Sequence, residues 1–218
     1  MKSLKILHII TGLKVGGAEN ALHRLIVNSP ENFRHEVLCL TKGGSMHEVF
    51  IESNIKVVTL DFKKSFFNSL IFLFKIIRLK KPDIVQTWLY HANLIGGIVA
   101  KFTGVKIIIW GLRGTAIPQS VFSINHLIIR LGSFFSYFIP SSIVCNAKTV
   151  SQFHIKKGYC KKKISIINNG FSQNSSILNR EKYLNKIDGL DSDSIIIGTV
   201  GRYDKLKDYP NMINAFSN

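Results

Sequence analysis

Three cations follow a glycine near the carboxyl end of the chain. Residues 195–200 are mostly apolar and lead into that glycine, and after it come Arg202, Lys205 and Lys207. An arginine offers a planar fork for two phosphate oxygens, and a lysine adds a mobile point charge. Because a helix is expected to begin near Tyr209, this strand–loop–helix unit predicts a site for a phosphorylated ligand. On spacing alone, a solvated basic loop is an equal alternative.

A glycine turn lies near the amino end. Residues 11–19 follow the first apolar run and open a helical pattern, with Gly16 and Gly17 at the junction. Glycines let a ligand approach the backbone, and the free N–H groups of a helix N-terminus attract anions. The spacing is not G-x-G-x-x-G, and no acidic residue ends the second predicted strand, so a nicotinamide enzyme is disfavoured. A tight turn that only joins strand to helix is the alternative.

Aromatic and polar side chains follow the strand predicted at 83–87. They are Trp88, Tyr90, His91 and Asn93, placed where the strand ends and a helix begins. Aromatic rings can stack on a sugar or a base, and a histidine can donate to hydroxyls or titrate near neutrality. The alternative is that His91 caps the helix while the aromatic rings belong to the core.

Arg113 follows the next predicted strand, at 106–110, and stands between Gly111 and Gly114. A guanidinium in this position can clamp a phosphate or a carboxylate. A solvated loop arginine is the alternative. Both this position and the 88–93 segment follow strands whose carboxyl ends are expected to face one crevice.

These residues need a scaffold in which apolar strands and helices alternate. Nearly continuous apolar strands indicate a parallel sheet covered on both faces, so we expect an α/β fold with a doubly wound, Rossmann-like sheet. Strands are predicted near residues 4–10, 36–40, 56–59, 83–87, 106–110, 142–145, 164–167 and 195–200. Helices are predicted near residues 18–28, 46–53, 68–80, 92–102, 122–138 and 150–156, with a last one from Tyr209.

The composition changes after Ile167. Residues 168–176 are polar and turn-rich, and charged, weakly patterned sequence continues to about residue 192. We therefore expect a Rossmann-like domain over 1–170, a linker over 171–193, and the first strand and helix start of a second domain over 194–218. Such a piece cannot bury its strand alone, so either it docks on the first domain or the natural protein continues.

The chain is strongly basic, with 29 Lys and Arg against 13 Asp and Glu and a net charge of +16. Nucleic acid, anionic membranes and phosphorylated substrates each explain such a charge. No recognised nucleic-acid motif is present, so nucleic acid is not expected as a partner. Cys39, Cys145 and Cys160 lack paired metal-ligand spacing, which predicts reduced thiols in a cytosolic protein and no metal site.

Basic and apolar residues are mixed over 62–67 and 70–81, and a second basic patch covers Lys156, Lys157 and 161–163. A basic amphipathic helix can lie on an anionic membrane. The favoured alternative is a helix that covers the sheet with its lysines in water. Since we find neither a signal peptide nor a long apolar span, we expect a cytoplasmic protein that can lie on the inner face of the plasma membrane. A non-catalytic membrane- or partner-binding module stays an alternative function.

Several of these segments together resemble a known family. They are Gly-Gly-Ala-Glu at 16–19, Pro-Asp-Ile-Val at 82–85, Trp-Leu-Tyr-His-Ala-Asn at 88–93, Asn-Asn-Gly at 168–170, and Val-Gly-Arg at 200–202 with Lys207. In this order they resemble the family-four glycosyltransferases, retaining nucleotide-sugar-dependent enzymes with two Rossmann-like domains (the GT-B fold). Bacterial members of that family build lipopolysaccharide, capsule and other surface glycans.

The resemblance implies roles for the motif residues. Gly16, Gly17, Arg202 and Lys207 would bind the donor diphosphate, and fixed cations stabilise its departure without a metal. Catalysis would fall to His91 and Arg113. The acceptor or the transferred sugar would contact Trp88, Tyr90 and Asn93. The expected partners are a nucleotide-sugar co-substrate and a glycan or lipid-linked acceptor, with no cofactor.

The sequence departs from the family pattern in two places. Many relatives carry a histidine at the end of the strand before Arg113, where this chain has Trp-Gly-Leu-Arg. Arg113 therefore either replaces that histidine or has a different role. The paired glutamates of the family would lie beyond residue 218. The resemblance thus predicts an acceptor-side domain with a truncated second domain, and little or no transferase activity for this chain alone.

Overall fold

The structure is a computed structural model that describes residues 3–115, 124–171, 195, 197–201, 203 and 207–216. The chain divides into two units, Met1–Phe171 and Ser172–Asn218. Each unit is considered on its own.

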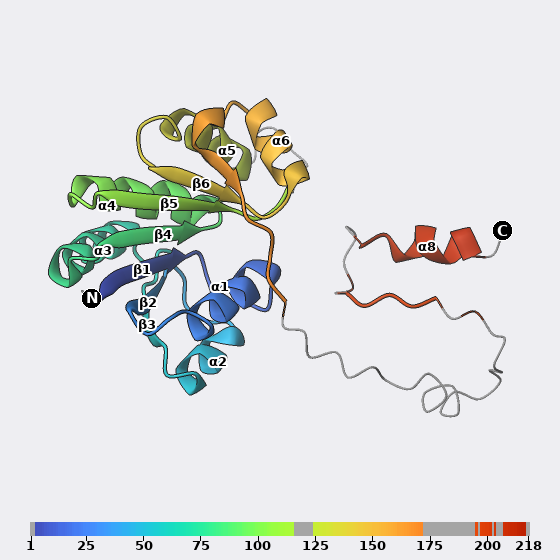
Figure 1. The fold of residues 1–218 in the computed structure, drawn as a ribbon, viewed down its shortest axis with the longest axis horizontal. Coiled ribbons are helices and arrows are strands. Elements are labelled where there is room, and N and C mark those ends of the chain that lie inside the picture. The colour runs from blue at the N-terminus through green and yellow to red at the C-terminus, as the bar shows by residue number, and fades with distance from the viewer. Residues whose placement is uncertain are drawn as a thin grey trace. The chain divides into compact units, whose positions relative to one another are not determined.

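The first unit is built on a seven-stranded parallel sheet of order β3-β2-β1-β4-β5-β6-β7 (Figure 1). Its strands are β1 (Leu4–Ile10), β2 (Phe33–Cys39), β3 (Lys56–Thr59), β4 (Ile84–Trp88), β5 (Ile107–Leu112), β6 (Ser142–Cys145) and β7 (Ile164–Ile166). The chain moves outward from β1 to β3 and then returns to β4 beside β1. This reversal makes a topological switch point between β1 and β4, where ligands of such sheets bind.

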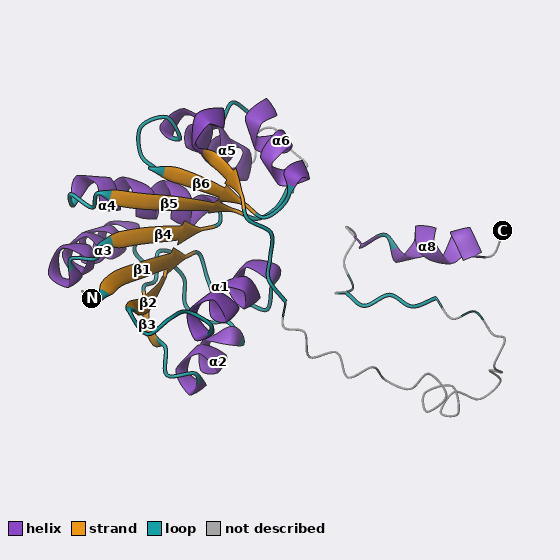
Figure 2. Cartoon of the chain, in the orientation of Figure 1, coloured by secondary structure: helices purple, strands orange, loops and turns teal. Residues whose placement is uncertain are grey.

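Helices cover the sheet on both faces (Figure 2). They are α1 (Gly17–Val27), α2 (Met46–Glu52), α3 (Phe66–Lys80), the π-helix η1 (Ala92–Gly96), α4 (Gly97–Phe102), α5 (Ile124–Phe135), α6 (Lys148–Lys156) and the 3₁₀ turn η2 (Lys161–Lys163). Because crossovers between parallel strands are right-handed, α1 and α2 lie on one face and the helices that follow β3 lie on the other.

Two buried clusters match these two faces. The first packs α1 and α2 on the sheet through Leu22, Met46, Phe50, Val37 and Trp88. The second packs the helices of the other face through Leu73, Ile77, Val99, Ile129 and Val85. The alternation of side chains along each strand produces this division, since successive residues point to opposite faces.

The expected doubly wound sheet is confirmed, and β1, β3 and β6 have the predicted bounds. One predicted helix differs in form, because residues 92–102 begin as a π-helix before the α-helix from Gly97. Two glycines at this junction allow the helix to approach the sheet closely, and a Cβ at Gly97 would overlap the Trp110 ring. The helix expected at 122–138 is observed as α5, and residues 122–123 lie outside the described residues.

The strand predicted at 195–200 is wrong for this structure. Residues 195 and 197–200 have no strand assignment, and Val200 is fully exposed. A strand needs a neighbouring strand to pair its backbone groups, and the described residues of the second unit contain none. The helix expected from Tyr209 is confirmed as α8 (Tyr209–Phe216).

Candidate functional site

The carboxyl ends of β1, β4 and β5 bring most of the predicted site residues to one edge of the sheet. Register pairs Ile10 with Trp88, and Trp88 with Gly111. The turns that begin after these residues therefore lie next to one another. At this edge a hollow of about 240 Å³ is lined by Leu89, Tyr90, Gly111, Leu112, Arg113 and Gly114.

The glycine turn after β1 has an open helix start. Gly16 is the extended residue before α1, and no side chain caps the helix there. A Cβ on Gly16 would collide with the end of the Glu19 side chain, which folds back over the turn, so a larger residue there requires that carboxylate to move. A Cβ on Gly17 would meet nothing within 4 Å. Packing therefore does not explain Gly17, and close approach of a ligand stays the prediction for that position.

Arg113 is held over an aromatic ring. Its guanidinium carbon lies 4.4 Å from the centroid of a Trp88 ring, and Nη1 donates a hydrogen bond to Asn169 Oδ1. Nε of Arg113 is buried and has no hydrogen-bond partner in the described part of the chain. Burial, and then repulsion from Arg24, lower the pKa of Arg113. The side chain is thus not a solvated loop arginine but a fixed, partly desolvated cation beside the hollow.

Trp88 lies beneath Arg113 and is fully buried. Its indole N–H donates to His8 Nδ1 at 3.3 Å. Because no part of the ring is exposed, Trp88 has no surface with which to touch a sugar in this structure. Its observed contact is with the guanidinium, so it supports the site from below.

Asn93 is also buried, at 3% exposure. Its Oδ1 accepts a hydrogen bond from Thr87 Oγ1 at 2.7 Å, and its Nδ2 donates to the Gly111 carbonyl at 3.1 Å. The amide therefore ties η1 to β4 and β5. As with Trp88, burial turns a predicted contact residue into one that fixes the loops around the hollow.

Tyr90 lines the hollow and is bonded to its wall. Its hydroxyl lies 2.8 Å from His154 Nε2 and 3.1 Å from the Gly114 carbonyl oxygen. Burial raises the pKa of Tyr90 to about 12. Burial also lowers the pKa of His154, which is fully buried on α6. The tyrosine is therefore a neutral hydrogen-bonding group under ordinary conditions.

His91 is the residue before η1 and is partly buried, which lowers its pKa. A neutral imidazole can accept or donate a hydrogen bond at a substrate hydroxyl.

Leu89, two residues before His91, has a positive φ of 73°. A non-glycine residue with such a backbone is strained and often marks a functional turn.

The cations near the carboxyl end belong to the second unit. Arg202 and Lys205 lie outside the described residues, and Lys207 is exposed.

Sequence reasoning missed four neighbours of the site, namely Arg24, His8, His154 and Phe171. Helical spacing gives a signal for Arg24, because residues 17, 20 and 24 share one face of α1.

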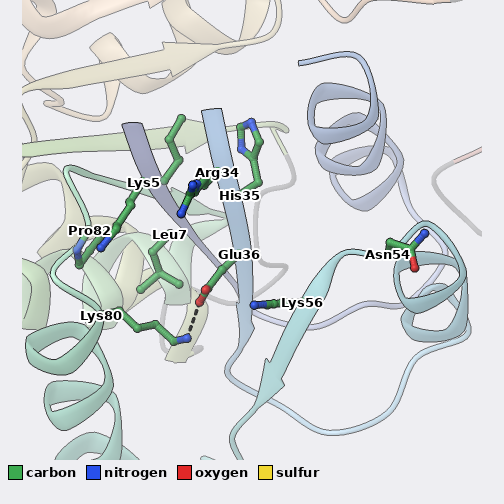
Figure 3. A pocket seen from close by; sticks show the side chains of 10 residues that line it. Lys5, Leu7, Arg34, His35, Glu36, Asn54, Lys56, Lys80 and Pro82 are labelled. Atoms are coloured by element: carbon green, nitrogen blue, oxygen red, sulfur yellow. Dashed lines mark ion pairs between the residues drawn. The ribbon is translucent and has the colours of Figure 1, made fainter. Parts of the chain in front are cut away.

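A larger hollow, of about 450 Å³, lies at the opposite edge of the sheet (Figure 3). It is lined by residues near the amino ends of β1, β2 and β3, including Lys5, Arg34 and Lys56, and by the ion pair of Lys80 with Glu36. Ligands of open parallel sheets bind at the carboxyl edge. The smaller hollow beside Arg113 is therefore the better candidate site. The described residues hold no cluster of three metal-ligating side chains.

Comparison with known proteins gives a family match. The family model described as Glycosyltransferase Family 4 matches residues 15–174. The chain is 25% identical over 212 residues to the Escherichia coli UDP-Gal:alpha-D-GlcNAc-diphosphoundecaprenol alpha-1,3-galactosyltransferase, covering 91% of this chain and 54% of that protein. It is 26% identical over 226 residues to the Staphylococcus aureus capsular polysaccharide biosynthesis glycosyltransferase CapM, covering 99% of this chain and 58% of that protein. The chain thus spans little more than half the length of these relatives.

Solved structures share the fold. Anabaena Alr3699/HepE in complex with UDP superposes with a TM-score of 0.66 at 17% identity, over 78% of this chain and 45% of that one. The lipopolysaccharide outer core galactosyltransferase WaaB, in its apo form, gives a TM-score of 0.57 at 15% identity, over 78% and 46%. At these identities the likeness shows the fold alone, a Rossmann-like domain of GT-B glycosyltransferases.

Proposed function

Because the chain belongs to glycosyltransferase family 4, we propose that it transfers a sugar from a nucleotide-sugar donor to a glycan or lipid-linked acceptor in the synthesis of bacterial surface polysaccharide. The observation that carries the proposal is the fixed guanidinium of Arg113 on Trp88, beside the hollow at the carboxyl edge. A sugar transfer that expels a nucleoside diphosphate builds negative charge. Fixed cations in a partly desolvated site stabilise such charge without reorganising.

The proposal assigns roles to the predicted residues. Arg113 stabilises charge near the transferred sugar, and neutral His91 and Tyr90 bind hydroxyl groups. Gly17 lets the donor phosphates approach the start of α1, together with Arg202 and Lys207. Transfer proceeds with retention of the anomeric configuration and uses no metal.

Because this chain spans little more than half the length of these relatives, we further propose that turnover requires the part of the relatives beyond the matched region. The test is a transfer assay on a protein extended by a family-four second domain, with a panel of radiolabelled nucleotide-sugars and a polyprenyl-diphosphate-linked sugar. We expect transfer with one donor, a product of retained configuration, and a rate about 10² to 10³ lower for Arg113→Ala.

Two results would contradict these proposals. Turnover by residues 1–218 alone at the rate of the extended protein would refute the need for the second domain. Failure of the extended protein to transfer any sugar of the panel to a glycan or lipid-linked acceptor would refute the transferase.

An anionic membrane surface is the further partner we propose. α3 exposes Phe67 near its start and Leu79 near its end, which are 77% and 83% exposed, and it also exposes the cations Lys75 and Arg78. Apolar side chains among cations are typical of helices that lie on anionic membranes. No helix among the described residues is long and apolar enough to span a bilayer. A non-catalytic membrane-binding module rests on the same surface and is the second candidate function.

A further inference from the structure

The guanidinium groups of Arg24 and Arg113 are near enough to interact electrostatically, and each packs against an aromatic ring. Arg113 sits on Trp88, and the guanidinium carbon of Arg24 lies 5.0 Å from the centroid of the Phe171 ring. Asn169, which accepts from Arg113, is two residues before Phe171. Since two residues of extended chain span roughly 7 Å, one short segment carries both the hydrogen-bond acceptor of Arg113 and the aromatic ring that Arg24 packs on.

Arg24 and Arg113 are close enough for their positive charges to repel each other. Repulsion from Arg24 adds to burial in lowering the pKa of Arg113. Both guanidiniums nevertheless stay charged, because arginine is not deprotonated in proteins. The pair therefore holds two positive charges near each other, a state that a bound anion relieves.

Each arginine also has one buried N–H group without an acceptor in the described part of the chain. The Nε atoms of Arg24 and Arg113 are buried, and neither has a hydrogen-bond partner among the residues that the structure describes. A buried N–H without an acceptor is unfavourable.

We propose that Arg24 and Arg113 together bind a phosphate or diphosphate group of the acceptor. Phosphate oxygens accept two hydrogen bonds from one guanidinium edge, and two guanidiniums suit a diphosphate. The assignment to the acceptor rests on the proposed function, in which Arg202 and Lys207 take the donor diphosphate, and it gives Arg113 a second role besides stabilising charge near the transferred sugar. It assigns a role to Arg24, which is outside the motifs that the family resemblance marks.

The test is calorimetric titration of the 218-residue chain with three probes: inorganic pyrophosphate, a short-chain isoprenyl diphosphate and UDP. The variants are Arg24→Gln, Arg113→Gln and the double variant. Arg130→Gln, on an exposed part of α5, makes the same charge change elsewhere. We expect pyrophosphate and isoprenyl diphosphate to bind about tenfold to a hundredfold more weakly to each single variant, because each loses charge-assisted hydrogen bonds. Arg130→Gln should bind like the unchanged chain.

A further variant guards against misfolding. Phe171 is 79% exposed, so Phe171→Leu keeps every charge and leaves the core untouched. Loss of the ring beneath Arg24 should weaken pyrophosphate binding about two- to fivefold. Thermal unfolding of all variants verifies that they fold.

Because phosphate binding does not depend on sugar transfer, the titrations test this inference separately from the proposed function. Unchanged binding in both arginine variants, or an equal loss in Arg130→Gln, overturns the site. Binding of UDP alone through the pair overturns its assignment to the acceptor. If the pair binds isoprenyl diphosphate while the extended protein transfers no sugar, the transferase proposal fails and the phosphate site holds.

Discussion

The ring beneath Arg113 is fixed by a chain of histidines. Trp88 N–H can only donate, so His8 accepts at Nδ1 and carries its proton on Nε2. His8 then donates to His35 Nδ1 at 2.9 Å. Both imidazoles must be neutral for these two hydrogen bonds to form. Burial lowers the pKa of His8 to about 3 and lowers that of His35 as well.

The hydrogen bonds that join Trp88, His8 and His35 predict that acid destabilises the fold. Below pH 6.5 His8 is protonated in the unfolded chain but stays neutral in the folded protein. The free energy of unfolding therefore falls as the pH drops from 6.5 toward 3. The contribution is about 1.4 kcal/mol per pH unit. We expect urea unfolding between pH 6.5 and 5 to show at least this slope, because burial lowers the pKa of His35, His91 and His154 in the same direction, and we expect His8→Gln to reduce it. Ile10→Val, which removes buried volume without a titrating group, should lower stability equally at each pH. An unchanged slope in His8→Gln would contradict the assignment.

Side-chain burial explains which site residues the sequence could predict. The positions of Tyr90 and Arg113 after neighbouring parallel strands were enough to predict that they lie together, and both line the same hollow, whereas His91 is not among its lining residues. The inward direction of Trp88 and Asn93 depends on strand register and on the π-helix, neither of which leaves a clear pattern in one sequence. Arg24 was missed because its partners, Arg113 and Phe171, are far from it along the chain.

The apolar runs and glycines predicted most of the elements, because each parallel strand is buried on both faces and reads as a continuous apolar segment. Residues 195–200 have the same composition but no neighbouring strand among the described residues of their unit. Local sequence therefore predicts that a segment suits a sheet, whereas pairing depends on the sheet being present.

Substitution by alanine should affect stability differently at Gly97, where α4 starts, and at Gly17, where α1 starts. Gly97→Ala places a Cβ against the Trp110 ring, so we expect a loss of about 1–3 kcal/mol in unfolding free energy by overpacking, although alanine is the better helix former. Gly17→Ala meets no atom within 4 Å and should leave stability unchanged or slightly higher. Urea unfolding of both variants is the measurement. A stable Gly97→Ala protein would show that η1 and α4 are free to move away from the sheet.

At the level of the whole chain, the charge of +16 suits two proposed functions that agree with each other. Cations at the carboxyl edge suit phosphorylated substrates, and cations on α3 suit an anionic surface. A lipid-linked acceptor would bring both together, since its phosphate lies at the membrane surface. The described chain contains the carboxyl edge and α3 within one unit, Met1–Phe171.

Membrane binding through α3 is therefore a prediction for the intact chain. We expect sedimentation with vesicles of phosphatidylglycerol but not of phosphatidylcholine, and release as salt rises from 0.1 to 1 M, because the Debye length then shrinks from about 10 to 3 Å. Leu79→Ser should weaken binding about tenfold through lost apolar burial. Leu25→Ser makes the same substitution on α1, across the sheet, where Leu25 is 42% exposed, and should bind normally. Equal binding to both vesicle types, or equal losses in the two variants, would remove α3 as the membrane surface.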